Sequence, residues 1–302
     1  MCGILLLDKP AGLSSNAALQ RVRRVLGADK AGHVGSLDPL ATGMLPICLG
    51  EATKVAGEIL SGRKRYRFAI GLGSRTATGD TEGSVVETAP VPVLDEAQIG
   101  RVLQAFLGSQ SQIPPMYSAI KREGQPLYRL ARAGIEVQRE PRNIEIFELC
   151  RVGFEGSHLK LEALCSKGTY IRTLAEDIAR KLGTCGHVTE LRRLFVEPFE
   201  DEAMETLEGL SAQPWAHPPR ILPADWPLRH LPAALLDATQ TSMMLHGQSV
   251  VSGGSHAEGT VRLYAPGEEF LGLGQSDGRG TVRPRRLFVR AQSASAAADR
   301  AV

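Results

Sequence analysis

The sequence predicts an α+β fold in two parts, a larger part that mixes strands with helices and a small C-terminal β-barrel. In several segments apolar and polar residues alternate, which is the period of a half-buried strand. In others apolar residues recur every three or four positions, as on a helix that packs against a core. After about residue 228 the pattern changes to short strands separated by glycine turns, which is typical of a small barrel.

Length and composition suit a globular protein of about two domains. The chain has 302 residues, of which 43% are apolar and 23% are charged, and its formal net charge is +2. No apolar run approaches the roughly 20 residues that a membrane-spanning helix needs, and Met1 to Pro10 reads as a buried strand rather than a signal peptide. We therefore expect no membrane association.

The cysteines indicate a reducing cytoplasm. There are five, widely spaced and without a C-x-x-C pair, which argues against a disulfide framework and against a zinc site. No residue set has metal-ligand spacing, and the glycine-containing loops match neither a P-loop nor a dinucleotide-binding fingerprint. We expect neither a metal nor a cofactor.

The elements of the larger part follow from these patterns in chain order. Strands are predicted near 3–7, 63–72, 144–152 and 159–165, and helices from Ser14 or Ser15 to about 26, at about 51–60, at 94–106 and at about 170–182. Between 31 and 54, glycines and prolines interrupt any regular period, so this segment is predicted to be an ordered loop on a scaffold.

The last third of the chain predicts a second domain. Residues 213–227 are rich in proline and tryptophan and are expected to link two domains. Short strands at 260–264, 270–274 and 285–289 predict the barrel, and 291–302 is predicted to be a disordered tail. We therefore divide the chain into domains at 1–225 and 228–290.

Basic residues gather locally, although the whole chain is nearly neutral. The clusters are Arg21, Arg23, Arg24 and Lys30; Arg63, Lys64, Arg65 and Arg67; residues 121–142; Arg192 and Arg193; and Arg283, Arg285 and Arg286. The segment 121–142 carries six basic and three acidic side chains around a short helical pattern, and we interpret it as an exposed excursion from the core. Such clusters can form a face for a phosphate backbone, or can simply be solvated surface.

Two charged residues are candidates for chemistry. Asp38 lies in the irregular loop before Pro39, where an aspartate can be catalytic or can simply cap a turn. Arg172 lies at the start of a predicted helix, where the helix dipole disfavours a positive charge. It is therefore either a surface arginine or the partner of a distant carboxylate. An arginine beside a buried Asp38 is expected to lower the pKa of that carboxyl and hold it ionised.

Further candidates are open to two interpretations each. Tyr66 and Tyr170 can be core residues or rings that stack on a nucleobase. Lys9 can anchor a phosphate or pair with Asp8, and His33 can contact a base or be an ordinary loop histidine.

Several ordered blocks resemble the TruB-type tRNA pseudouridine synthases. They are GHVGSLDPLATGMLPICLGEATK within 32–54, KRYR at 64–67, IPPMYSAIK at 113–121, CSKGTYIRTLAEDIARKLG at 165–183 and HVTELRRL at 187–194. The resemblance runs from Gly3 to about Phe199, and the C-terminal part resembles the PUA-like ending of bacterial members. It implies a mixed, mostly antiparallel sheet with flanking helices.

The resemblance also implies an activity and roles for the candidates. Family members convert the T-loop uridine at position 55 of tRNA to pseudouridine on a flipped-out nucleotide, without cofactor or metal. The implied catalytic residues are Asp38 as the essential carboxylate, Tyr66 as the ring that stacks on the target uracil, and Arg172 as the partner of Asp38. The implied substrate-binding residues are Lys9, His33, Tyr170, Leu191 and Asp80. The 121–142 excursion resembles a thumb that closes on RNA.

Some positions and rival functions stay open. Val34, Ala77 and Gly79 depart from the residues that relatives often carry, which could alter RNA contacts. Asp38 can act as nucleophile or base. The rivals are a guide-RNA-dependent catalytic subunit, an RNA-folding factor without required catalysis, and a glycosidase, which would need a second carboxylate. The chain begins almost at the first strand and ends soon after the barrel, which favours a stand-alone enzyme that acts on tRNA without guide RNA or a protein partner. We also expect a monomer.

Overall fold

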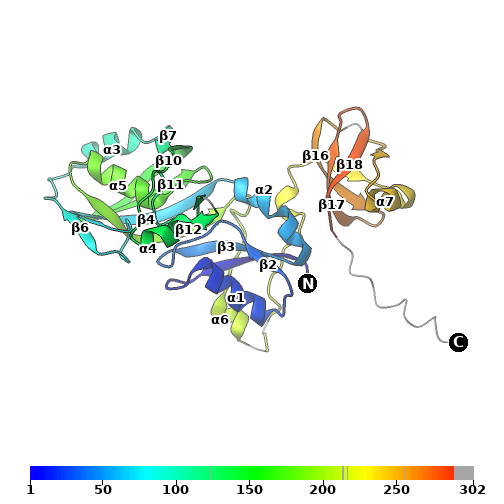
Figure 1. Cartoon of the computed structure of the whole chain (residues 1–302), viewed down its shortest axis with the longest axis horizontal. Coiled ribbons are helices and arrows are strands. Elements are labelled where there is room, and N and C mark those ends of the chain that lie inside the picture. Colours follow the sequence, from blue (N-terminus) through cyan, green and yellow to red (C-terminus); the bar gives the residue numbers. More distant parts are fainter. Residues whose placement is uncertain (123, 213, 216, 255, 289–302) are drawn as a thin grey trace.

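A computed structural model of the chain describes residues 1–288 except 123, 213, 216 and 255. Figure 1 shows a large sheet with helices and, at the C-terminal side, a smaller separate sheet. The predicted tail at 291–302 lies outside the described residues. Within the described part of the chain, no helix is long and apolar enough to cross a membrane.

A mixed sheet forms the larger part. Its strands are β1 (Gly3–Lys9), β2 (Ala31–His33), β3 (Thr42–Leu49), β4 (Lys64–Leu72), β7 (Gly108–Gln112), β10 (Arg142–Glu155), β11 (His158–Cys165), β12 (Gly186–Val196) and β13 (Glu205–Thr206). Their order is β13-β1-β3-β12-β4-β11-β10-β7, with β2 beside β3. The pairs β1–β13 and β3–β12 run parallel and the other pairs antiparallel, which confirms the expected fold class.

Helices cover the sheet. They are α1 (Ser15–Val25), α2 (Ala56–Ser61) after a 3-10 turn η1 (Gly50–Val55), α3 (Glu96–Gln104), α5 (Ile171–Lys181) and α6 (Leu207–Ser211). Side chains of α1, α3, α5 and α6 share one core with alternate residues of β1, β3 and β4, whereas the intervening residues of β1 and β3 pack with α2 on the other face. Both faces of β1 and β3 are therefore buried.

The segment at 31–54 is not the loop that the sequence predicts. It forms β2 and β3, and seven of the eight residues of β3 are buried. Pro46 can lie inside β3 because neither neighbour on one side of that strand pairs with it there. On that side the pairing of β3 with β12 ends at Gly43, and its pairing with β2 begins only at Ile47. The Pro46 carbonyl still accepts a hydrogen bond from the amide of Val34, at 2.8 Å. Only the stretch between β2 and β3 is a true loop.

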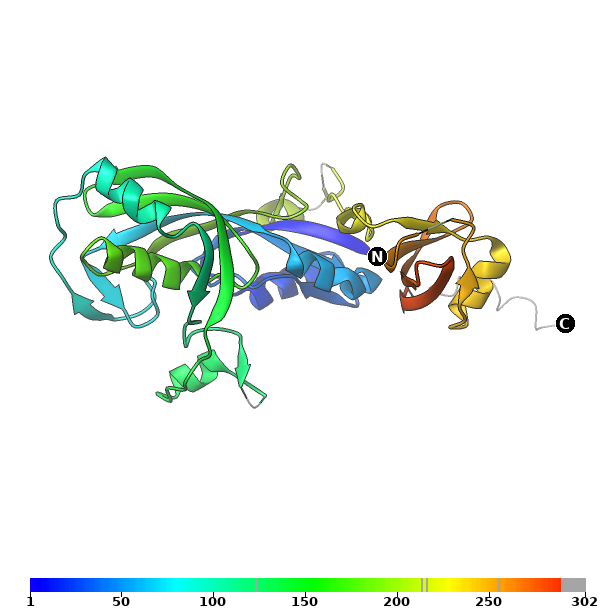
Figure 2. The same ribbon diagram turned by 90° about the horizontal axis from the view of Figure 1, so that it is seen from above.

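The excursion between β7 and β10 projects from the larger part, as Figure 2 shows. It contains β8 (Lys121–Arg122), β9 (Gln125–Pro126) and α4 (Leu127–Arg132). A second hairpin, β5 (Ser74–Thr76) with β6 (Val85–Thr88), lies beyond the end of β4.

The C-terminal part is a curled sheet, a half-barrel with strand order β14-β16-β17-β18-β15. Its elements are β14 (Ala233–Leu235), α7 (Ala238–Leu245), β15 (Val250–Val251), β16 (Gly259–Ala265), β17 (Glu269–Ser276) and β18 (Thr281–Leu287), after a 3-10 turn η2 (Trp226–Leu228). It touches the larger part at η1, where Val55 packs against Leu228 and Leu273. Lys54 also donates to the carbonyl of Leu287, at 2.7 Å.

Candidate active site

Asp38 lies in the loop between β2 and β3, and the first residue of α1 holds that loop. The hydroxyl of Ser15 donates to the carbonyl of Leu37 at 2.9 Å and accepts from the Leu37 amide at 2.7 Å. On the other side, the amide of Gly12 donates to the carbonyl of Pro39. The Asp38 side chain is 36% exposed, so its carboxylate is fixed in place but open to a substrate.

Arg172, in the first turn of α5, contacts both carboxylate oxygens of Asp38. Its Nε is 2.9 Å from Oδ2, and its Nη2 donates to Oδ1 at 3.1 Å. Nη1 donates to the carbonyl of Thr78 at 2.9 Å, and Nη2 also donates to the carbonyl of Tyr117 at 2.7 Å. A two-point contact of this kind fixes the orientation of the carboxylate. The partner carboxylate expected from the position of Arg172 is therefore present.

A second carboxylate lies behind the pair. Asp80 is 3% exposed, and its Oδ2 is 3.8 Å from Nε of Arg172. Its Oδ1 accepts from the hydroxyl of Thr78 and from the amide of Glu82. The neighbouring Gly79 has φ +77°, a backbone conformation that other residues rarely adopt, and a Cβ there would lie 3.3 Å from Cβ of Arg172. The glycine at this departure from the family pattern thus lets the loop approach α5.

The electrostatics of Asp38 correct one expectation. Burial raises the pKa of the Asp38 carboxyl above its usual value, the positive charge of Arg172 opposes this rise, and the negative charge of Asp80 adds to it. Arg172 does act to lower the pKa of Asp38, as expected. The expected net lowering of that pKa is wrong, because the effect of desolvation is larger.

This balance predicts the acid limb of the pH–rate profile. If the ionised Asp38 is the active form, activity falls as pH drops through a pKa higher than that of an ordinary aspartate. Asp80→Asn removes the negative charge that helps to raise this pKa, so the acid limb should move to lower pH. kcat/KM for a stem-loop RNA, measured across about pH 4 to 8, checks this. A limb that moves to higher pH or stays in place would contradict it.

Lys9 does not pair with Asp8. It is fully buried, and its ammonium group donates to the carbonyls of Pro10, Leu13 and Pro39. Burial lowers the pKa of Lys9 to about 8. Asp8 instead forms a two-point ion pair with Arg192. Lys9 therefore stabilises the Asp38 loop through its hydrogen bond to Pro39. Its ammonium group does not face solvent, where a phosphate could reach it.

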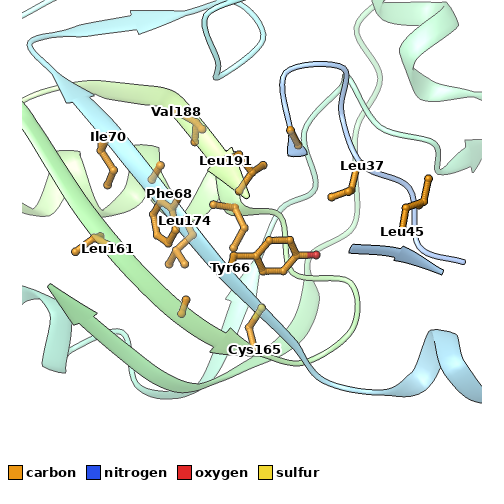
Figure 3. Packing of buried hydrophobic residues seen from close by; sticks show 14 of the residues in the cluster. Leu37, Leu45, Tyr66, Phe68, Ile70, Leu161, Cys165, Leu174, Val188 and Leu191 are labelled. Atoms are coloured by element: carbon orange, nitrogen blue, oxygen red, sulfur yellow. The ribbon is translucent and has the colours of Figure 1, made fainter. Parts of the chain in front are cut away.

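Aromatic and aliphatic side chains line the sheet beside this loop. Tyr66 and Leu191 are buried in the main core, and Figure 3 shows the Tyr66 ring directed toward the chain that carries Leu37. Burial raises the pKa of the Tyr66 hydroxyl. Tyr170 is half-buried at the start of α5. His33 is half-buried in β2, and no hydrogen-bond partner of its buried Nδ1 is found among the described residues.

Two residues near the site were not singled out from the sequence. Arg193 was assigned to a basic surface cluster, yet it is 1% exposed and donates to the carbonyls of Met44 and Gly35. Gln112, 5% exposed, is hydrogen-bonded to the backbone of Tyr170. Adjacent residues in a strand point to opposite faces, so Arg192 and Arg193 cannot both lie on the same face of the sheet. This alternation could have indicated that one of the two arginines is buried.

Within the part of the chain that the structure describes, no three His, Cys, Asp or Glu side chains come together as they would at a metal site. Asp38 and Asp80 meet at a guanidinium instead. The arrangement is a carboxylate that an arginine orients, beside an aromatic ring.

Comparisons with known proteins identify the family. Residues 23–171 match the model of the TruB family pseudouridylate synthase N-terminal domain, and 172–229 and 232–288 match two TruB C-terminal domain models. A protein of Aromatoleum aromaticum named tRNA pseudouridine synthase B is 51% identical over 286 residues, covering 94% of this chain and 92% of that protein. One of the same name from Chromohalobacter salexigens is 48% identical over 298 residues, covering 97% and 96%.

Solved structures share the fold. The protein in a structure titled as an H/ACA RNP bound to a substrate RNA containing 2'-deoxyuridine aligns with a TM-score of 0.70 at 23% identity, over 96% of this chain and 86% of that one. One from a Cbf5-Nop10-Gar1 complex aligns with a TM-score of 0.69 at 24% identity, over 95% and 85%. The close sequence relatives, rather than these distant folds, decide the family. The chain belongs to the TruB family of pseudouridylate synthases.

Proposed function

We propose that this chain converts uridine to pseudouridine in tRNA, at the T-loop uridine of position 55, and that Asp38 is its catalytic carboxylate. The observation that carries the proposal is the contact of Arg172 with both oxygens of a partly exposed Asp38. The two relatives reported above carry the name tRNA pseudouridine synthase B, which supports tRNA as the substrate.

The reaction needs a carboxylate held beside a sugar and its base. Pseudouridine formation breaks the bond between N1 and C1′, turns the uracil and joins C1′ to C5, so N1 gains a proton and C5 loses one. A carboxylate can attack C1′, attack C6, or remove the C2′ proton. Because Arg172 fixes Asp38 from one side, the free face of the carboxylate can meet the flipped-out nucleotide in one orientation.

The neighbouring residues suit the pocket roles that the family pattern implies. Tyr66 comes from the strand beside Leu191, and its ring is directed toward the loop of Asp38, where it could stack on the uracil once the nucleotide has entered. The same phenol is a candidate to take the C5 proton. Tyr170 and His33 would contact the rest of the flipped-out nucleotides, whereas Lys9 and Asp80 would act by supporting the loop and Arg172.

Asp80 does not make the site a glycosidase. That chemistry needs two carboxyl groups on either side of the scissile bond, roughly 5 to 10 Å apart. Asp80 is 3% exposed, and its oxygens face Thr78, Glu82 and Arg172 rather than solvent. The geometry therefore favours one reacting carboxylate with a buried second charge behind it.

The proposed division of labour is catalysis in 1–225 and added RNA contact from the C-terminal half-barrel. Arg283, Arg285 and Arg286 on β18 are exposed and could meet a phosphate backbone. We further propose that a single chain suffices, without guide RNA or a protein partner.

Pseudouridine mapping tests the proposal. The purified chain, incubated alone with an unmodified tRNA transcript, should form pseudouridine at the T-loop uridine and at no comparable rate elsewhere. A transcript with that uridine replaced by cytidine is the control. No product, or product only when a guide RNA or second protein is added, would overturn the proposal.

Deleting the excursion should weaken RNA binding. Because Arg142 pairs with Gln112 in the sheet, the deletion must stop short of β10; replacing 121–138 by a short glycine-serine linker keeps that pairing. It removes four basic side chains, so we expect the Kd for tRNA to rise by about 10-fold or more and its salt dependence to weaken. Filter binding at several salt concentrations measures both. An unchanged Kd would refute a clamping role.

A further inference from the structure

Gln112, the last residue of β7, holds the residue from which α5 starts. Its amide Nε2 donates to the carbonyl of Tyr170 at 3.1 Å, and its Oε1 accepts from the Tyr170 amide at 2.8 Å. The side chain is almost fully buried, so water cannot easily replace either bond. Both backbone groups of Tyr170 are thus held by one side chain from another strand.

This hold matters because α5 has no side-chain cap of its own. Tyr170 occupies the N-cap position with an extended backbone, and its side chain makes no capping bond. Serine, threonine, aspartate and asparagine are preferred at this position because their side chains accept a hydrogen bond from the first turn. Here Gln112 fixes the path of the chain into that turn, and Arg172 is the second residue of the helix.

The chain that follows Gln112 contacts Arg172 directly. Gln112 leads directly into residues 113–120, which we call the root of the excursion. Within the root, the Tyr117 carbonyl accepts from Nη2 of Arg172 at 2.7 Å, and the same nitrogen donates to Asp38. The root therefore touches Arg172 directly at Tyr117, while Gln112 acts on it through Tyr170.

We propose that Gln112 is a positioning residue for the reaction, which acts through Tyr170 to align Arg172 on Asp38. This inference rests on the proposed function and adds to it a residue that never meets the substrate. It also separates two roles: the excursion at 121–138 sets RNA affinity, and the root with Gln112 sets the rate of the chemical step.

The test compares Gln112→Met with Gln110→Met. Methionine has nearly the length of glutamine but cannot make the two bonds to Tyr170. Gln110 lies two residues earlier in β7, on the same face. Among the described residues its side chain bonds only to the carbonyl of Leu107, so it is a matched control. We expect Gln112→Met to lower kcat for a T-arm stem-loop by roughly 10- to 100-fold with KM changed less than about 3-fold. Its acid limb should move to higher pH, because a loosened Arg172 opposes the rise in the Asp38 pKa less.

The outcomes are separable. Equal kcat in the two variants, a loss confined to KM, or a lowered kcat with an unmoved acid limb would overturn the inference. Thermal unfolding of both variants shows whether each is folded; if Gln112→Met is unfolded, Gln112→Glu, which keeps an acceptor for the Tyr170 amide, is measured against Gln110→Glu with the same criteria. A wild-type chain that forms no pseudouridine would instead refute the proposed function.

Discussion

Asp38→Asn is expected to abolish pseudouridine formation while tRNA still binds. Asparagine has the shape of aspartate, but its amide can neither act as a nucleophile nor remove a proton. By analogy with the loss of a nucleophile in other enzymes, turnover should fall by roughly 10⁴-fold or more. The loop should keep its path, because Ser15 and Gly12 hold it through its backbone and not through Asp38. The basic clusters that would contact RNA are unchanged.

Single-turnover assays with excess enzyme and a binding assay on the same tRNA check this pair of results. Asp29→Asn, at an exposed aspartate in the turn before β2, is the control and should behave as wild type. Asp38→Ala repeats the test with a residue that cannot revert to aspartate by deamidation. Residual activity above a few per cent in both Asp38 variants would remove Asp38 from the reaction. An equal loss of binding and turnover would mean that the substitution damages the RNA site.

The parts of the fold with a clear period could be predicted from sequence. The helix at 170–182 corresponds to α5, and the strand at 63–72 to β4, because one side of each is buried against a single core. β3 could not be predicted in this way, since it is buried on both faces and contains a proline. In β12 the pairing with β4 is irregular on either side of the segment Glu190–Arg193, which interrupts the alternation of buried and exposed side chains along the strand.

The site shows a similar division. Asp38 and Arg172 could be singled out because each is in an unusual place for its charge, in a glycine-rich loop and in a helix's first turn. Their contact joins residues 134 positions apart, and only the folded chain shows it. Lys9 and Arg193 look like surface cations in the sequence, and their burial against backbone carbonyls depends on the loop between β2 and β3. The net pKa shift of Asp38 depends on the same burial.

Arg172→Ala should also remove activity, by about 10³-fold, because Asp38 loses its orienting contacts and Asp80 loses its neighbouring cation. Arg172→Lys should not restore it. A single ammonium cannot contact both oxygens of Asp38 and also the carbonyls of Thr78 and Tyr117. The control is Arg180→Ala on the same helix, where the side chain is 71% exposed and forms an ion pair with Asp177 of the preceding turn. A near-normal rate for Arg172→Ala would show that the contact is not needed.

A double-mutant cycle on stability separates the ion pair from a general loss of packing. Removing Arg172 leaves the buried Asp80 and the partly buried Asp38 without their cation, so the free energy of unfolding should fall by about 2 to 4 kcal/mol. In Asp38→Ala one of those two charges is already gone, so adding Arg172→Ala should cost about 1 kcal/mol less than it does alone. Urea denaturation of the four proteins gives the coupling energy. Additive effects would mean that Arg172 supports the fold through its other partners, Thr78, Tyr117 and Asp80, and that its contact with Asp38 adds no stability.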